Sequence, residues 1–154
     1  MGGLQLSPDG TQVPIPANLA LMGRGPILQV TVSVPQSISE ALVQQGIAVA
    51  APITGLALID TGATATCVDE VAAQKLGVPV VDVTLMHSAS HANIPSNRYP
   101  IHFDVVGIPM GVDVPTAIGA ALESQGLLLL IGRDVLGHCL LVYNGATGAF
   151  SLSI

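Results

Sequence analysis

The sequence predicts a single, mainly β domain of barrel-like or sandwich architecture, with few and short helices. Short runs in which apolar and polar residues alternate recur along the chain, as expected of half-buried strands. The segments between these runs leave room only for brief helices, and many short strands with few helices indicate a barrel or a sandwich. Of the 154 residues, 50% are hydrophobic but only 3% are aromatic, so we expect a core built from Val, Leu, Ile and Ala.

The chain begins with a segment that does not resemble the rest of the domain. Residues 1–26 are rich in Gly, Pro and other turn-forming residues ("SPDGTQVPIP"), and we expect an N-terminal extended arm there. The domain then spans residues 27–154. Its first strand is predicted at 27–35, where every second residue is Leu or Val and a proline ends the run.

Two short helices are predicted on either side of the strand "GLALID" (55–60). The first, "SISEALVQQG", opens with Ser37 and carries Glu40 three residues later, which is the pattern of a capping box, and it ends at a glycine. The second, "DEVAAQKLG", is expected to be capped by Asp69 and to end at Gly77.

A long hairpin is predicted in the middle of the chain. Residues 81–87 ("VDVTLMH") and 99–106 ("YPIHFDVV") have the composition of strands. The link between them, 88–98, is polar, so we expect it to form the tip of the hairpin.

Four further elements are predicted in the C-terminal third. Residues 115–126 ("PTAIGAALESQG") are predicted as another short helix, and 127–132 ("LLLLIG") as a buried strand. Residues 133–137 ("RDVLG") have room for only one or two helical turns. A hairpin over 139–154 closes the chain, with Asn144-Gly145 as its turn signal.

Charge and cysteine content exclude several classes of protein. The formal net charge is −6 and the four Lys and Arg residues are scattered, so we expect no basic patch and no nucleic-acid partner. No signal peptide or transmembrane segment is visible, so we expect a cytoplasmic protein with no membrane partner.

Cys67 and Cys139 lie in apolar runs and are expected to be buried free thiols. His102 and His138 are isolated and are expected to be ordinary strand or turn residues.

The stretch "ALIDTGATAT" (57–66) carries the strongest functional signal. An apolar strand delivers Asp60 into a Thr-Gly turn, and a carboxylate at the end of a buried strand is unfavourable unless it is hydrogen-bonded, paired or used. Gly62 permits a tight turn because it has no Cβ atom. Further along the chain, a second apolar strand ends at Gly132 and is followed by Arg133 and Asp134.

In these pieces the sequence resembles the retropepsin-like aspartic proteases, which comprise the retroviral-type proteases and their cellular and bacterial relatives. Residues 58–63 ("LIDTGA") match the catalytic loop of that family, 88–98 its flap, and 130–134 ("LIGRD") the segment that supports the loop. The resemblance covers roughly residues 27–154. It implies a closed, barrel-like acid-protease fold with short helices and one lobe per chain.

The resemblance also implies an endopeptidase in which two carboxylates share one proton. The ionised carboxylate takes a proton from a water molecule while the protonated one polarises the scissile carbonyl. This chain has a single Asp-Thr-Gly, so the second Asp60 must come from a second copy, which predicts a C₂ homodimer. Only 9% of residues are charged, against about 25% in an average protein, which leaves apolar surface for such an interface. No cofactor and no metal ion is expected.

Asp60 is therefore the expected catalytic residue. By resemblance, Thr61 would hydrogen-bond across the dimer axis, Gly62 would offer its backbone to the carboxylate and the substrate, and Ala63 completes the active-site loop. Ala63 replaces the hydroxyl residue of the pepsin-like branch, so we expect activity to extend toward mildly acidic or near-neutral pH. The expected flap over an extended peptide substrate has its tip at Ser88, Ala89, Ser90, His91, Ala92 and Asn93. Structural support for the loop is expected from Ile131, Gly132, Arg133 and Asp134.

The partner of Arg133 stays open at the level of sequence. In retroviral members this arginine pairs with an acid just after the catalytic loop, where this chain has Thr64. Either Asp69 or Asp134 could take the place of that acid. The substrate is expected to carry hydrophobic residues on both sides of the cleaved bond, because the chain supplies Val, Ile, Leu and Met for the pockets.

Two other functions remain as alternatives. The chain could form a catalytically silent dimer that binds extended peptides in the same groove, or a domain that serves assembly alone. A metal site at His87 and His91 is disfavoured because they lie in a predicted hairpin with no Cys or acidic partner nearby. A serine esterase is disfavoured because no G-x-S-x-G elbow occurs.

Overall fold

The computed structural model describes residues 4–6, 12–86 and 94–154, and the chain is mainly β, with 44% strand and 23% helix. Two compact units are present: residues 28–137 form one, and residues 1–27 together with 138–154 form the other. The first unit contains the strands and helices that surround Asp60, and it is described first.

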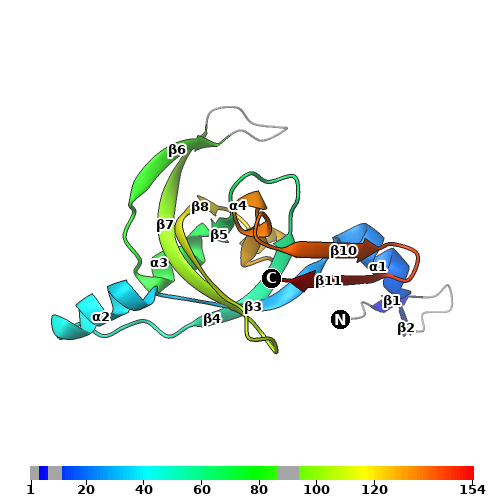
Figure 1. Ribbon diagram of the computed structural model, residues 1–154, viewed down its shortest axis with the longest axis horizontal. Helices are drawn as coiled ribbons and strands as arrows, with labels where there is room; N and C mark the ends of the chain where they lie inside the picture. The colour runs from blue at the N-terminus through cyan, green and yellow to red at the C-terminus, as the bar shows by residue number, and fades with distance from the viewer. Residues whose placement is uncertain (1–3, 7–11, 87–93) are drawn as a thin grey trace. The chain divides into compact units, whose positions relative to one another are not determined.

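The larger unit is built around a closed barrel of six strands (Figure 1), which confirms the prediction of a mainly β, barrel-like fold. The hydrogen-bonded order is β3-β4-β9-β5-β8-β7, and pairing of β3 with β7 closes the ring. A seventh strand, β6, adds to the outer edge of the long strand β7. The elements of this unit are β3 (Ile27–Ser33), α2 (Gln36–Gln44), β4 (Ile53–Ile59), β5 (Cys67–Asp69), α3 (Glu70–Leu76), β6 (Asp82–Met86), β7 (Ile94–Val105), β8 (Gly111–Ala120), the 3₁₀ turn η1 (Glu123–Gln125), β9 (Leu129–Ile131) and α4 (Arg133–Leu136).

The barrel interior holds the core of the unit. Inward-facing aliphatic side chains such as Val30, Ile101 and Leu129 are fully buried, which agrees with the predicted aliphatic core. Two aromatic side chains, Tyr99 and Phe103, are also among the largest fully buried groups, so the few aromatic residues are not confined to the surface. From Ile101 to Val105 of β7 the buried residues alternate with more exposed ones, as a strand with one face in the core requires.

Several predicted elements are confirmed with small shifts of their ends. The strand predicted at 27–35 is β3, and the buried strand predicted at 127–132 is β9. The second predicted helix is α3, in which the Asp69 carboxylate accepts the Ala72 N–H at 3.1 Å and Gly77 ends the helix with φ of 69°. That positive φ is the left-handed conformation that favours glycine at a helix end.

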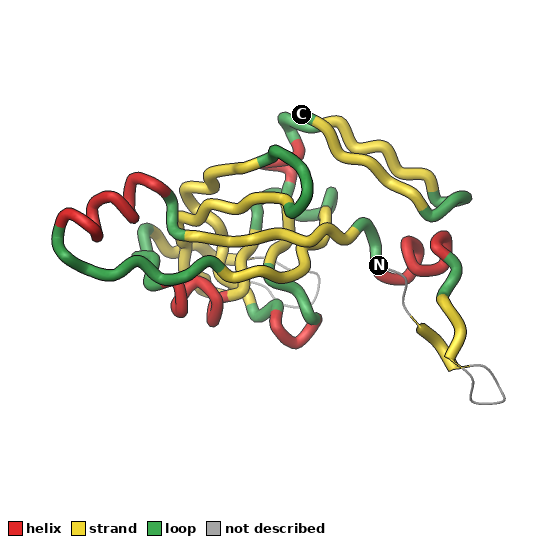
Figure 2. Tube along the Cα trace, turned by 90° about the horizontal axis from the view of Figure 1, so that it is seen from below, coloured by secondary structure: helices red, strands yellow, loops and turns green. Residues whose placement is uncertain are grey.

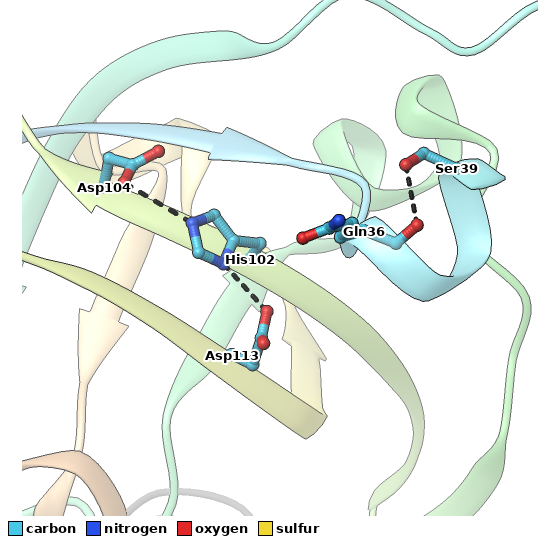
Figure 3. Close-up of polar contacts among 5 residues, drawn as sticks. All are labelled: Gln36, Ser39, His102, Asp104 and Asp113. Atoms are coloured by element: carbon cyan, nitrogen blue, oxygen red, sulfur yellow. Dashed lines mark hydrogen bonds and ion pairs between the residues drawn. The ribbon is translucent and has the colours of Figure 1, made fainter.

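The capping box predicted for the first helix is wrong. Helix α2 begins after Pro35, and no side chain caps its N-terminus. Ser37 already has helical backbone, since the preceding proline stands in the cap position and fixes the entry of the chain. Glu40 instead accepts a hydrogen bond from the side chain of Gln36 at 2.7 Å. The Ser39 hydroxyl donates to the Gln36 carbonyl at 2.9 Å (Figure 3).

The helix predicted at 115–126 is also wrong, because β8 occupies the first part of that range and only η1 is helical. The β-branched Ile118 has a strand on each side, with Arg98 as its partner in β7 and Cys67 in β5. The register between β7 and β8 shifts close to Pro115, so this proline stands at an irregularity of the ladder, where prolines within strands are tolerated. Strand pairing on both sides outweighs the helix-forming alanines of this segment.

The smaller unit combines the two ends of the chain. It contains β1 (Leu4–Leu6), β2 (Gln12–Pro14), α1 (Ala17–Arg24), β10 (Leu140–Asn144) and β11 (Ala149–Ser153). Helix α1 contacts β11, and the Tyr143 hydroxyl donates to the Leu21 carbonyl at 3.3 Å. Figure 2 shows the C-terminal hairpin as two paired strands that end at the C-terminus. The N-terminal segment is thus more than an extended arm, and the closing hairpin groups with it rather than with the barrel. Among the described residues, no helix is both long and apolar enough to span a bilayer.

Candidate active site

The loop that follows β4 places Asp60 at the end of a barrel strand. Strand β4 pairs in parallel with β9, with Ile59 opposite Ile131, and the backbone N–H of Asp60 donates to the Ile131 carbonyl at 2.9 Å. Both isoleucines are buried, so the apolar run before Asp60 is explained by the barrel core. The hydrogen bonds between β4 and β9 fix the position at which the chain leaves the sheet, and they therefore fix the position of Asp60.

The Asp60 carboxylate is half-buried and is held on one oxygen. Its Oδ1 accepts the N–H of Gly62 at 2.9 Å and that of Ala63 at 3.2 Å. Within the described residues no hydrogen-bond donor reaches Oδ2. A Cβ atom at Gly62 would lie 3.1 Å from Asp60 Oδ1, so glycine allows the carboxylate to fold back over the turn.

The segment predicted to support the loop lies directly against it. The Arg133 N–H donates to the Ala63 carbonyl at 3.0 Å, and the Asp134 N–H donates to the Thr64 carbonyl at 3.2 Å. At Gly132 an added Cβ would lie 2.5 Å from the carbonyl carbon of Ala65, so only glycine permits this approach. The structure thus brings residues 131–134 and the loop after Asp60 together.

The side chain of Arg133 binds the loop rather than a carboxylate. Its Nη1 donates to the Thr61 carbonyl at 2.9 Å and to the Gly62 carbonyl at 3.3 Å, and its Nη2 donates to the Thr64 hydroxyl at 3.0 Å. Neither of the two acids considered from the sequence is its partner. Asp69 caps α3 and also accepts the N–H groups of Leu122 and Glu123, each at 3.0 Å.

Asp134 is bound by a residue that the sequence did not single out. Its carboxylate accepts the Thr66 N–H at 2.9 Å and the Thr66 hydroxyl at 2.8 Å, while that hydroxyl accepts the Gly132 N–H at 3.1 Å. Thr66 is fully buried. The only signal in the sequence was the third threonine of "TGATAT", which has no recognisable meaning without the contact to the distant strand end.

Cys67, which follows this junction, is buried as predicted. Burial, together with the negative charges of Asp134 and Asp60, raises the pKa of its thiol to about 11. The thiol is therefore protonated at neutral pH and is a poor nucleophile or metal ligand. Cys139 is less buried than predicted, and partial burial raises the pKa of its thiol as well.

The hairpin predicted to carry the flap is present. Strands β6 and β7 pair in antiparallel fashion from Asp82 opposite Arg98 to Met86 opposite Ile94. Arg98 donates to the Thr84 hydroxyl of β6 at 3.2 Å and to the Thr116 hydroxyl of β8 at 3.4 Å, so it links three strands at the base of the hairpin. The predicted flap residues Ser88, Ala89, Ser90, His91, Ala92 and Asn93, and His87 before them, lie outside the described residues.

His102 is not isolated, contrary to the prediction. Its Nδ1 lies 2.8 Å from the Asp113 carboxylate and its Nε2 lies 3.4 Å from that of Asp104 (Figure 3). Gly111 faces this group, and a Cβ there would lie 2.8 Å from Asp104 Oδ1. Because each ring nitrogen faces a different carboxylate, the three side chains cannot chelate one ion. Across the described ranges no group of three or more His, Cys, Asp or Glu side chains is placed to hold a metal.

The chain was compared with models of known protein families and with curated proteins, and none of them matches it.

Proposed function

We propose that the chain is one protomer of a homodimeric aspartic endopeptidase of the retropepsin type, in which Asp60 and its counterpart in a second copy activate a water molecule. The observation that carries the proposal is the state of the Asp60 carboxylate. Backbone N–H groups fix one oxygen of a half-exposed carboxylate, while the other oxygen is not engaged by the described residues. A free oxygen on a fixed carboxylate is what a water-activating base needs.

A comparison within the chain supports this role over a structural one. Asp69 is a structural carboxylate: it is 6% exposed and accepts backbone N–H groups on both oxygens. Asp60 also follows a strand, yet it retains an unused oxygen and an exposed flank. The difference favours chemistry at Asp60, because a carboxylate that serves structure alone is normally satisfied on both oxygens when buried.

A second carboxylate has to come from a second copy. Asp134 is the carboxylate that is hydrogen-bonded to the segment after Asp60, and both of its oxygens already accept hydrogen bonds from Thr66. A pair of carboxylates about 3 Å apart shares a single proton, since two like charges at that distance do not both ionise. A two-fold axis beside Asp60 would create such a pair from one acidic residue per chain.

In this reaction the ionised carboxylate removes a proton from water, and the hydroxide equivalent attacks the scissile carbonyl carbon. The protonated carboxylate donates its proton to the carbonyl oxygen, which gives a gem-diol intermediate. Collapse of that intermediate breaks the C–N bond: the proton held by the first carboxylate passes to the leaving amine, and one gem-diol hydroxyl returns its proton to the second carboxylate as the new C=O forms. One water is consumed, and the two products carry a new carboxyl group and a new amine.

The substrate class follows from the same site. By the resemblance, the β6–β7 hairpin would be the counterpart of the family's flap, and an extended peptide would lie between the hairpin and the Asp60 loop. Backbone groups recognise such a peptide in extended form, and pockets for alternate side chains supply specificity. We expect hydrophobic residues on both sides of the cleaved bond.

The test is cleavage of a diverse peptide mixture between pH 3 and pH 8, read by mass spectrometry, for the wild type, Asp60→Asn and the control Asp104→Asn. Asp104 is an exposed residue of β7, so its substitution removes one carboxylate charge without touching the loop. Cuts made by the wild type and the control but not by Asp60→Asn would support the proposal. Cuts that persist in Asp60→Asn would reject the proposal, and an absence of cleavage by all three proteins would reject it in favour of the silent peptide-binding dimer.

A further inference from the structure

The positively charged side chain of Arg133 forms its observed hydrogen bonds with neutral groups of the loop after Asp60. Its guanidinium contacts the carbonyls of Thr61 and Gly62 and the hydroxyl of Thr64. In the described part of the chain no carboxylate lies within ion-pair distance of it. The planar guanidinium is suited to bidentate pairing with a carboxylate, whereas Arg133 binds two carbonyl groups and a hydroxyl instead.

The explanation lies in the two peptide groups between Arg133 and Asp60. The carbonyl of Thr61 and the N–H of Gly62 belong to one peptide group, and the carbonyl of Gly62 and the N–H of Ala63 belong to the next. Arg133 Nη1 binds both carbonyls, at 2.9 and 3.3 Å, while Asp60 Oδ1 binds both N–H groups, at 2.9 and 3.2 Å. In a trans peptide group the carbonyl and the N–H point in opposite directions. Each group is thus held between the cation and the carboxylate.

This arrangement aligns every partial charge favourably. The positive guanidinium faces two carbonyl oxygens, and the two N–H hydrogens face the negative carboxylate. Hydrogen bonds in such chains polarise one another, so a cation on the carbonyl side strengthens the N–H bonds to the carboxylate. The loop needs this support because Ala63 offers no hydroxyl to Asp60 and Thr64 offers no acid to Arg133.

We propose that Arg133 is the positioning residue of the Asp60 carboxylate and acts through the peptide groups between residues 61 and 63, with the Thr64 hydroxyl fixing the orientation of its guanidinium. The consequence for catalysis rests on the proposed function, but the consequence for the loop does not. Lysine cannot replace Arg133, because a single ammonium group lacks the planar fork that reaches two carbonyls and a hydroxyl together.

Two kinds of measurement test the proposal on the full chain. Amide hydrogen exchange and ¹⁵N chemical shifts report the N–H groups of Gly62 and Ala63, and kcat and KM are measured on a peptide cut by the wild type. The variants are Arg133→Gln, Arg133→Lys, Thr64→Val and Thr64→Ser. Arg24→Gln, in α1 of the other unit, controls for the loss of one positive charge.

Arg133→Gln is expected to lower kcat by roughly 10- to 100-fold with KM changed by less than about threefold, since misplacing a reacting group by about 1 Å costs up to about 10²-fold. It should also speed exchange of the Gly62 and Ala63 amides. Arg133→Lys should behave like Arg133→Gln. The kcat and the amide exchange rates of Thr64→Val should lie between those of Arg133→Gln and the wild type. Thr64→Ser keeps the hydroxyl, so its values should stay close to those of the wild type.

The proposal is overturned if Arg133→Gln leaves both amides as protected as Arg24→Gln does, or if Arg133→Lys retains wild-type kcat. Should Arg133→Gln not fold, Thr64→Val alone decides, since it removes one hydrogen bond and leaves the cation in place. A wild type with no Asp60-dependent cleavage would refute the proposed function, whereas the two amides would still decide the role of Arg133.

Discussion

Thr66 and Asp134 lie 68 residues apart in the sequence and form the polar junction beneath the Asp60 loop. Asp134 accepts both the N–H and the hydroxyl of Thr66, and that hydroxyl in turn accepts the Gly132 N–H. Thr66 is fully buried and Gly132 is buried, so water does not replace the bond between the Thr66 hydroxyl and the Gly132 N–H when it is lost, whereas the Asp134 carboxylate is exposed. The end of β9 and the loop after β4 are thereby joined into one rigid piece.

Thr66→Val keeps the shape of the side chain and removes its hydroxyl. The buried Gly132 N–H then loses its acceptor, and an unsatisfied buried group costs about 1–3 kcal/mol. The exposed Asp134 carboxylate loses only one of its donors. We expect the free energy of unfolding, measured in urea, to fall by about that amount. Thr66→Ser retains the hydroxyl and should lose about 1 kcal/mol or less, since it deletes a single methyl group. Equal stability of Thr66→Val and the wild type would contradict the role of the hydroxyl.

Asp69 is expected to be the most important carboxylate for stability. It caps α3 and accepts the N–H groups of Leu122 and Glu123, which tie η1 to the helix start. Asp69→Ala should therefore destabilise the protein by about 2–4 kcal/mol, from a lost cap and two unsatisfied N–H groups. Asp104→Ala, at an exposed carboxylate, should change stability by no more than about 0.5 kcal/mol. Thermal unfolding of the two variants makes the comparison, and similar losses would refute it.

Much of the barrel could be predicted from the sequence, because its strands carry a local signal. Alternation of apolar and polar residues located β3, and a run of leucines located β9. The helix predicted over 115–126 failed because its alanines favour a helix only when neighbours are ignored. In the fold, Ile118 is fixed by strands on both sides. Such non-local pairing leaves no trace in local composition.

The candidate site likewise has a part that could be predicted from the sequence and a part that could not. The Asp60 loop was recognisable because the apolar strand, the acid and the glycine are consecutive. The partner of Arg133 was not, since the sequence suggested an acid and the fold supplies carbonyl groups, which every residue has. The role of Thr66 was equally invisible, because its acceptor comes from a distant strand end. Contacts to the backbone, and between segments far apart in the chain, need the coordinates.

The Cys67 thiol predicts a loss of stability at alkaline pH. Its pKa is raised from an ordinary value of 9.0 to about 11, chiefly by burial and further by Asp134 and Asp60. The folded state thus favours the protonated thiol. Its contribution is complete below pH 9.0 and is lost as the pH rises from 9.0 to about 11.

The measurement is the free energy of unfolding between pH 8 and pH 11, with Cys139→Ala as the background in which Cys67→Ala is compared. The second thiol is replaced in both proteins because partial burial also raises its pKa. Cys67→Ala should show a shallower decline over this range. Parallel curves for the two proteins would show that the thiol of Cys67 is not protonated more strongly in the folded state than in the unfolded one.

Gly132→Ala tests whether the loop and the strand end must touch through backbone alone. An added Cβ would lie 2.5 and 2.6 Å from the carbonyl carbon and oxygen of Ala65, and 2.8 Å from the N atom of Thr66. These are backbone atoms, and the Thr66 N–H is bound by Asp134, so they cannot yield as the end of a flexible side chain could. We expect a loss of about 1–3 kcal/mol in unfolding free energy, as for other overpacked interiors. The control is Gly23→Ala in α1, where an added Cβ meets nothing within 4 Å and alanine favours the helix. If both substitutions leave stability unchanged, the loop after Asp60 can move away from β9 at little cost, and the close backbone contact at Gly132 does not hold the candidate active site in place.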